Sequence, residues 1–210
     1  MDRSAGAWSP RAGRGRGSRL VGPRCVGPRG RTLVVEGGRV RGGAAAMSVA
    51  LRNAQRTVLV RRASLRRAVC ALRTALGASR FDVGLVCAGN ALMQRLNAAY
   101  RHCPEPTDVL SFPFHQVAAG ELPQPRCREE YDLGDIFLGV EYIHQQCRKT
   151  GEDFDDVLTV TAAHGLCHLL GYRHNTKPEW EQMYQKEAQI LEELNRLTGS
   201  RLRPLTAGLY

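Results

Sequence analysis

The sequence predicts an α+β fold, in which a small twisted mixed sheet carries helices packed mainly on one of its faces. Short apolar segments typical of strands alternate irregularly with longer segments of helical spacing, without the β-α-β rhythm of a parallel sheet and without internal repeats. The patterned part begins at Met47 and leaves 164 residues, which is enough for one domain with a single substantial core.

Residues 1–46 differ in composition from the remainder. They contain ten arginines, no lysine, eleven of the 22 glycines and only two acidic residues, and so carry +8 of the formal net charge of +10. Without apolar periodicity, this extension is expected to be disordered. Two interpretations stay open. It is either a transit peptide, which implies the mitochondrial matrix, or a leader upstream of the start codon normally used, which leaves nucleus or cytosol open.

Four segments predict strands, and they are 49–60, 81–88, 109–114 and 136–140. Pro113 lacks an amide hydrogen, so the third strand is expected at an edge of the sheet or at a strand end. The unbroken apolar run of the fourth predicts a central position. The Gly- and Pro-containing segment 116–131 predicts a surface loop.

Five segments predict helices, and they are 63–76, 91–100, 141–149, 154–170 and 177–197. In the first, apolar residues at helical spacing turn four arginines outward, namely Arg62, Arg66, Arg67 and Arg73. These arginines form either a solvated face or a track for RNA, and the sequence leaves both open.

The chain contains seven cysteines, without a Cys-x-x-Cys pair and without a secretory signal, which predicts reduced thiols. Cys167 lies between two of the histidines described next and is expected to pack as a small hydrophobe. No apolar run approaches the 18 residues of a membrane span, so no membrane partner is expected.

Three histidines carry the main chemical signal, in His-Gly-Leu-Cys-His-Leu-Leu-Gly-Tyr-Arg-His from residue 164 to residue 174. His164 and His168 share one face of the predicted helix, since they are four residues apart. Gly171 can adopt left-handed backbone geometry, end the helix and return His174 as a third ligand. Three imidazoles leave a fourth position for water, which is typical of a catalytic Zn²⁺ site with one ion per chain.

The histidine spacing equals that of the metzincin proteases, with one important difference. Those enzymes carry a glutamate general base after the first histidine, and here that position is Gly165. A peptidase is therefore disfavoured, and a hydrolase with catalytic help from elsewhere in the chain is predicted.

Three further segments extend the pattern upstream, and they are Leu-Asn-Ala-Ala-Tyr-Arg at 96–101, Pro-Thr-Asp-Val-Leu-Ser-Phe-Pro-Phe at 106–114 and Leu-Gly-Asp-Ile-Phe-Leu-Gly at 133–139. With the histidine motif, they make the chain from about Met47 to Tyr210 resemble the YbeY family of endoribonucleases. The resemblance implies the same α+β fold and a metal-dependent hydrolase of single-stranded RNA that acts in ribosomal RNA maturation. Arg173 departs from the family pattern, which commonly has Asp before the last histidine.

The resemblance also implies roles for residues upstream of the histidines. It assigns Arg101 to catalysis, where its planar guanidinium would stabilise charge on the phosphate. Thr107, Asp108 and Ser111 are candidates for positioning substrate or orienting a ligand histidine, although turn and cap formation explain a Thr-Asp pair equally well.

The function predicted from these observations is a zinc-dependent endoribonuclease that processes ribosomal RNA precursors and contributes to small-subunit maturation. Its expected partners are single-stranded RNA and proteins of the small ribosomal subunit, with no DNA expected. The alternative is a non-catalytic ribosome assembly factor, in which the metal only holds the histidine turn in place.

Overall fold

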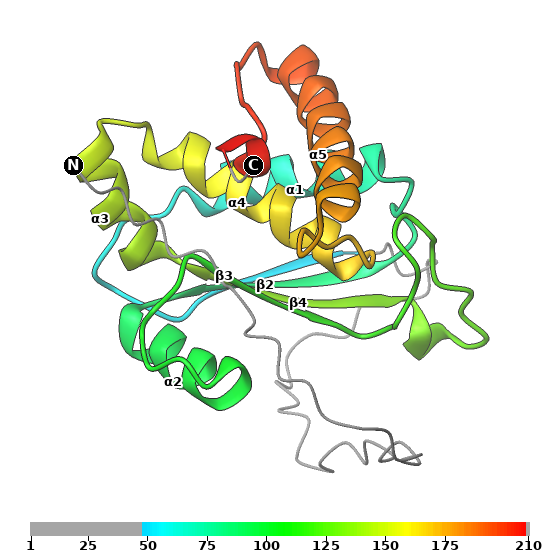
Figure 1. Cartoon of the computed structure of the whole chain (residues 1–210), viewed down its shortest axis with the longest axis horizontal. Coiled ribbons are helices and arrows are strands. Elements are labelled where there is room, and N and C mark those ends of the chain that lie inside the picture. Colours follow the sequence, from blue (N-terminus) through cyan, green and yellow to red (C-terminus); the bar gives the residue numbers. More distant parts are fainter. Residues whose placement is uncertain (1–47, 209–210) are drawn as a thin grey trace, which may run out of the picture. The chain divides into compact units, whose positions relative to one another are not determined.

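The computed structural model describes residues 48–208, in which four strands and five α-helices are found (Figure 1). The strands are β1 (Val49–Asn53), β2 (Asp82–Ala88), β3 (Val109–Pro113) and β4 (Asp132–Gly139). The helices are α1 (Arg62–Ala75), α2 (Asn90–Arg101), α3 (Val140–Thr150), α4 (Phe154–Leu169) and α5 (Lys177–Thr198). Short 3-10 helices occupy Arg128–Glu130 and Leu205–Gly208. The predicted disordered extension and Cys25 lie outside the described residues.

The four strands form one mixed sheet in the order β1-β2-β4-β3. β1, β2 and β4 are parallel, and β3 runs antiparallel to β4. β3 therefore lies at an edge, as Pro113 predicts, and the apolar β4 lies inside the sheet. β4 begins at Asp132, earlier than its apolar run, because ladder pairing with β2 extends the strand through polar residues.

The helices cover the two faces of the sheet unequally. One face packs against α1, α4 and α5 and forms the main core, to which Leu85, Ile136 and Leu166 belong. The opposite face carries α2 and a smaller cluster around Met93 and Leu110. Figure 1 shows the sheet between these two layers. The α+β class with helices mainly on one face is thus confirmed.

β1 is much shorter than the predicted strand 49–60, because the side chain of Gln55 replaces the ladder with a local turn. Its Oε1 accepts hydrogen bonds from the amides of Thr57 (2.7 Å) and Val58 (2.8 Å). Its Nε2 donates to Asn53 Oδ1 and to the Val58 carbonyl. A buried amide that satisfies four groups makes the turn more favourable than continued strand pairing.

α1 agrees with the predicted helix to within one residue at each end, but one of its four arginines was wrongly predicted to face outward. Arg73 is only 6% exposed and donates a hydrogen bond from Nη1 to the Phe81 carbonyl at 2.6 Å. Arg62, Arg66 and Arg67 are exposed. Helical periodicity alone missed the difference, because the segment that follows the helix covers Arg73 and supplies an acceptor.

α4 is the central helix of the main core and carries two of the three histidines. Every residue from Val160 to Cys167 is buried, which includes Cys167 as predicted. The helix starts at Asp153, whose side chain accepts a hydrogen bond from the Asp156 amide. It ends at Leu169, just before Gly171, which has a φ of +80°. A Cβ at Gly171 would also overlap the Val117 carbonyl oxygen, so only glycine fits this turn.

Candidate functional site

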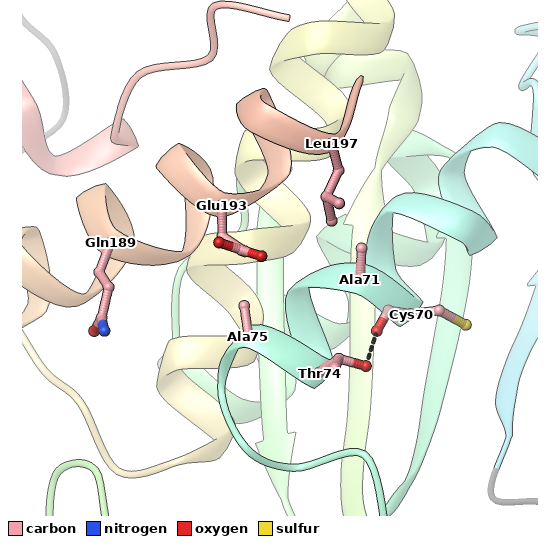
Figure 2. A pocket seen from close by; sticks show the side chains of 7 residues that line it. All are labelled: Cys70, Ala71, Thr74, Ala75, Gln189, Glu193 and Leu197. Atoms are coloured by element: carbon pink, nitrogen blue, oxygen red, sulfur yellow. Dashed lines mark hydrogen bonds between the residues drawn. The ribbon is translucent and has the colours of Figure 1, made fainter. Parts of the chain in front are cut away.

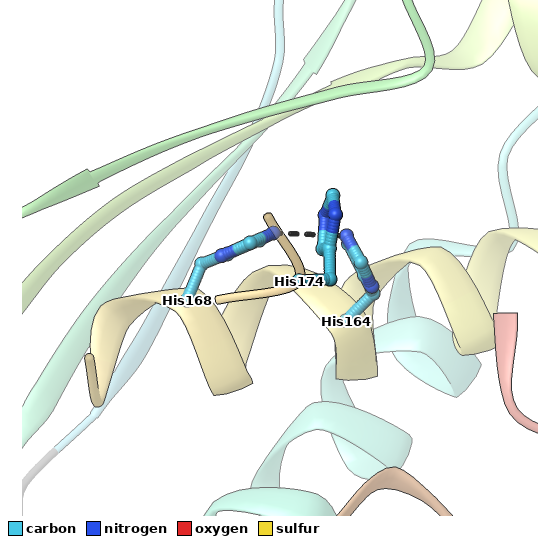
Figure 3. Close-up of side chains that lie close together, drawn as sticks. All are labelled: His164, His168 and His174. Atoms are coloured by element: carbon cyan, nitrogen blue, oxygen red, sulfur yellow. Dashed lines mark hydrogen bonds between the residues drawn. The ribbon is translucent and has the colours of Figure 1, made fainter. Parts of the chain in front are cut away.

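The end of α4 and the turn after Gly171 bring three histidines together. His164 and His168 project from one face of α4, and His174 returns from the turn (Figure 3). One ligand atom of each imidazole lies within 4.8 Å of the others. Because the three side chains come from rigid and largely buried backbone, their convergence is built into the fold.

Two of the histidines have the proton position of the ring set by a partner. His164 Nδ1 lies 2.7 Å from Oε1 of Glu187 on α5, and His168 Nδ1 lies 2.9 Å from the Tyr172 carbonyl oxygen. A carboxylate and a carbonyl only accept hydrogen bonds, so Nδ1 donates in both rings. In the neutral rings, both Nε2 atoms are therefore left with a free lone pair.

These two Nε2 atoms face each other at 3.0 Å. Two lone pairs at this distance repel unless a cation lies between them. Two nitrogen ligands of a tetrahedral zinc ion, at about 2.0–2.1 Å from the metal, are about 3.3 Å apart. The donor set therefore fits a divalent metal ion of zinc size.

The protonation state of the cluster also suits a metal. Burial lowers the pKa of His168 well below its usual value, and the nearby His164, His174 and Arg101 lower it further. Burial and His164 likewise lower the pKa of His174. Both imidazoles are consequently neutral at pH 7, which is the form that binds metal.

Glu187 is a site residue that sequence reasoning missed. Its side chain is 1% exposed, and its second oxygen accepts hydrogen bonds from the Thr206 amide (3.2 Å) and hydroxyl (2.9 Å). The sequence held a signal, since Glu187 interrupts the buried stripe of α5 between Met183 and Ile190. An acidic residue on an apolar helix face requires a buried partner, and here the partner is a histidine.

Gly165 explains why a metzincin glutamate has no place here. A Cβ at this position would lie 2.8 Å from Ile136 Cγ2 on β4 and 3.3 Å from Ser111 Oγ on β3. The residue after the first histidine therefore faces the sheet and lies against the side chains of Ile136 and Ser111. No larger side chain fits there without moving α4 away from the sheet.

Arg101 is the last residue of α2 and is exposed. Its positive charge is the smallest of the influences that lower the pKa of His168 and His174. Tyr100 beside it is 65% exposed, and its ring makes an edge contact with Phe112 of β3 at 4.8 Å. A cation and an exposed aromatic ring are thus neighbours at the end of α2, beside the edge strand.

The other three candidates make contacts within the protein. Ser111 Oγ donates to the Gly165 carbonyl at 3.2 Å and so connects β3 to α4. Asp108 Oδ1 accepts from the Thr107 hydroxyl (2.9 Å) and the Val109 amide (2.8 Å). Ser111 therefore lies at the back of the histidine cluster, and the Thr107–Asp108 pair forms the turn that leads into β3.

A hollow of about 460 Å³ lies elsewhere, between α1 and α5 (Figure 2). Its lining combines small apolar side chains with Thr74, Gln189 and Glu193. Thr74 already donates a hydrogen bond to the Cys70 carbonyl. The three histidines do not line this hollow. The side chains that do line it form no catalytic combination.

Comparison with known proteins agrees with this site. A sequence model described as endoribonuclease YbeY matches residues 51–195. Endoribonuclease YbeY of Homo sapiens is 56% identical over 165 residues, which cover 78% of this chain and 98% of the relative. The Bartonella bacilliformis relative of the same name is 38% identical over 113 residues, 54% of this chain and 68% of that protein.

Among solved structures, the solution structure of TM1509 from Thermotoga maritima is similar, with a TM-score of 0.46 and 18% identity over 75% of this chain and 98% of that chain. The sequence matches carry the assignment. The family model and the human relative each cover more than two thirds of the chain, and the residues that the model matches include Arg101 and all three histidines. The chain belongs to the YbeY family of endoribonucleases.

Proposed function

We propose that this chain is a zinc-dependent endoribonuclease that hydrolyses phosphodiester bonds of single-stranded RNA. The endoribonuclease class is that of the family. The observation that carries the metal part is the pair of Nε2 lone pairs at 3.0 Å, each with its Nδ1 proton held by a buried acceptor. Donor atoms arranged in this way can bind one cation together.

The ion would be held by His164, His168 and His174. Three imidazole nitrogen ligands suit zinc, and one ion per chain follows from the single cluster of this kind among residues 48–208. When bound, zinc acts as a Lewis acid and lowers the pKa of a coordinated water to about 7.

Residues of the protein then orient the metal ligands and stabilise charge on the phosphate. Glu187 accepts the Nδ1 proton of His164 and keeps that ring in one tautomer and one orientation. Arg101 would bind the scissile phosphate with two parallel N–H donors, and the charge that builds on the phosphate oxygens strengthens this contact. Its exposed position at the end of α2 leaves it accessible to a macromolecular substrate.

The preference for single strands is supported by the surroundings of Arg101. The ring of Tyr100 is exposed, and an edge contact with the ring of Phe112 holds it in place. A face of the Tyr100 ring is therefore available to an unpaired base. Bases inside a duplex are already stacked and cannot use such a ring. Substrate positioning by Thr107, Asp108 and Ser111 stays a prediction, since the contacts described above are structural.

Ribosomal RNA precursors as substrates, small-subunit proteins as partners and the mitochondrial matrix as location are further parts of this proposal. The family resemblance supports the first two, and the arginine-rich composition of residues 1–46 supports the third. No helix among the described residues is long and apolar enough to cross a membrane.

The direct test combines metal analysis with a cleavage assay. Purified protein is expected to contain one equivalent of zinc and to cut a defined single-stranded RNA. The same protein treated with a chelator should lose the cleavage and regain it when zinc returns. Full cleavage by metal-free protein would refute the proposed mechanism.

A further inference from the structure

Charge is distributed very unevenly along the described chain. Residues 49–81 contain eight arginines and no acidic residue, whereas residues 82–210 contain 12 basic and 18 acidic residues, a net charge of −6. The net charge of the whole domain is close to zero, so it does not reveal this separation. β1, the loop after it and α1 together form its strongly basic part.

Four of these arginines gather on one surface. Arg61, Arg62, Arg66 and Arg67 line a shallow hollow of about 770 Å³ at the start of α1. All four are exposed, and Arg61 is partly neutralised by Asp155 at 3.2 Å. We call these four residues and their hollow the α1 basic surface.

The α1 basic surface carries a cost in the free protein. Arg62 and Arg66 are four residues apart on a helix, where like charges repel each other. The first turn of α1 has no acidic residue and no side-chain cap, so the positive end of the helix dipole adds to the field. An anion bound in the hollow would remove both unfavourable terms.

The loop in front of α1 is held rigidly rather than left to adapt. Gln55 makes four hydrogen bonds within it, and Val60 at its end is buried. Arg56 and Leu59 consequently point outward from a fixed turn, and Leu59 is 89% exposed. The surface is thus preorganised, which lowers the entropic cost of binding a partner.

We propose that the α1 basic surface binds the phosphate backbone of RNA and docks the substrate at a place separate from the cleavage site. This inference rests on the proposed function and adds a second contact region to it. Arginine forks bind phosphate oxygens through two parallel hydrogen bonds, and their contacts carry no base information. The docked RNA is therefore held without sequence preference.

The geometry separates docking from cleavage. Asp155, the partner of Arg61, lies in the first turn of α4, whereas His164 and His168 lie in its last turns and His174 follows the helix. The nine helical steps from Asp155 to His164 correspond to a rise of about 14 Å. The loop before α1 and the turn after α4 are correspondingly found at opposite ends of α4 in Figure 1. A structured part of an RNA could dock at one end while its single strand reaches the other.

The test compares two triple variants of the full-length, zinc-loaded chain that lose the same total charge. Arg62→Gln, Arg66→Gln and Arg67→Gln together remove most of the α1 basic surface. Arg148→Gln, Arg201→Gln and Arg203→Gln together remove three exposed arginines from elsewhere. Both triples also carry Arg101→Ala, which slows cleavage of the probe during the measurement, and the reference protein carries Arg101→Ala alone. The melting temperature of neither variant should fall below that of the reference, because no contact in the core is touched.

The readout is the affinity for a fluorescent stem-loop RNA with a single-stranded tail, measured at several salt concentrations. The α1 triple variant is expected to bind about tenfold more weakly, with a salt slope lower by about 2, as three lost phosphate contacts predict. The distant triple variant should keep the slope of the reference. Equal slopes for all three proteins would overturn the proposal.

Two further measurements keep the conclusions apart. Binding to phosphatidylserine vesicles that the α1 triple variant loses, while RNA binding persists, would assign the surface to a membrane and overturn the proposal. Cleavage by the unmodified protein is assayed on its own, so a failure of the nuclease function leaves the RNA-binding comparison interpretable.

Discussion

Glu187 accepts a hydrogen bond from the proposed metal ligand His164. Its replacement is the best test of how this ligand is oriented. Glu187→Gln keeps the size of the side chain but removes the negative charge that faces the Nδ1 proton of His164. Zinc affinity should fall by about 10- to 100-fold, as for other partners of metal-bound histidines. Competition with a chromophoric chelator measures this affinity.

A matched control comes from the same group. Thr206→Val removes the hydroxyl that donates to the other oxygen of Glu187 but leaves the carboxylate beside His164. It is expected to lower stability more than zinc affinity, since a buried acceptor loses one partner. An unchanged zinc affinity in Glu187→Gln would contradict the proposal that Glu187 orients His164.

Replacement of a ligand histidine should reduce zinc binding more than replacement of Glu187 does. His164→Ala or His168→Ala removes a ligand from α4, so zinc content and RNA cleavage should fall together. Elemental analysis of the purified variants measures the metal. His144→Ala, a histidine whose ring packs on Phe154 away from the cluster, is the control and should retain zinc. A full equivalent of tightly bound zinc in either ligand variant would show that the site is wrongly assigned.

Arg101 separates an enzyme from an assembly factor. Arg101→Ala should slow cleavage by roughly a hundredfold, about 3 kcal/mol of transition-state stabilisation, while zinc content stays unchanged. Arg101→Lys keeps the charge without the fork and should retain partial activity. Cleavage in vitro and ribosomal RNA processing in cells are measured for the same variant. Normal values in both would end the catalytic role of Arg101.

At the scale of elements, the contact of α4 with the sheet depends on Gly165. Gly165→Ala should lower the free energy of unfolding by about 1 kcal/mol, because overpacking against Ile136 outweighs the better helix propensity of alanine. Chemical denaturation of the metal-free and metal-loaded protein measures the change. The zinc affinity of the variant should differ little from that of the unchanged protein if α4 moves as a unit.

A double-mutant cycle checks the cause of that loss. Ile136→Ala removes the methyl groups that a Cβ at residue 165 would meet, at a cavity cost of about 2–5 kcal/mol. In this background, Gly165→Ala should become neutral or stabilising, which gives a measurable coupling energy. Additive costs would mean that the glycine is required for another reason.

At the scale of the whole molecule, the folded part should be independent of the N-terminal extension. A chain that begins at Met47 is expected to keep its melting temperature and its RNA cleavage, because the sequence of residues 1–46 shows no apolar pattern that could join a core. Thermal unfolding and the cleavage assay are compared with those of the full chain. A large drop in melting temperature would contradict this, and a reporter fused to residues 1–46 tests the import hypothesis separately.

Much of the fold was predictable because its signals are local. The helix 63–76, the ligand helix 154–170 and the edge position of the strand with Pro113 all follow from periodicity or from a missing donor. The errors arose where a side chain made an unexpected contact. Gln55 ended β1 early, and the Phe81 carbonyl gave Arg73 a buried partner. Neither contact leaves a trace in hydrophobic periodicity.

The sequence by itself determined the ligand set, since two histidines four residues apart and a glycine that permits positive φ are properties of one short segment. The family motifs and the charge separation between residues 49–81 and 82–210 were likewise present in the sequence. Only the tertiary structure decided which groups support the ligands. Glu187 reaches His164 across 23 positions of sequence, and Gly165 is required by the proximity of Ile136. Such contacts depend on how α4 packs against α5 and the sheet, and packing between distant segments is not encoded in any local pattern.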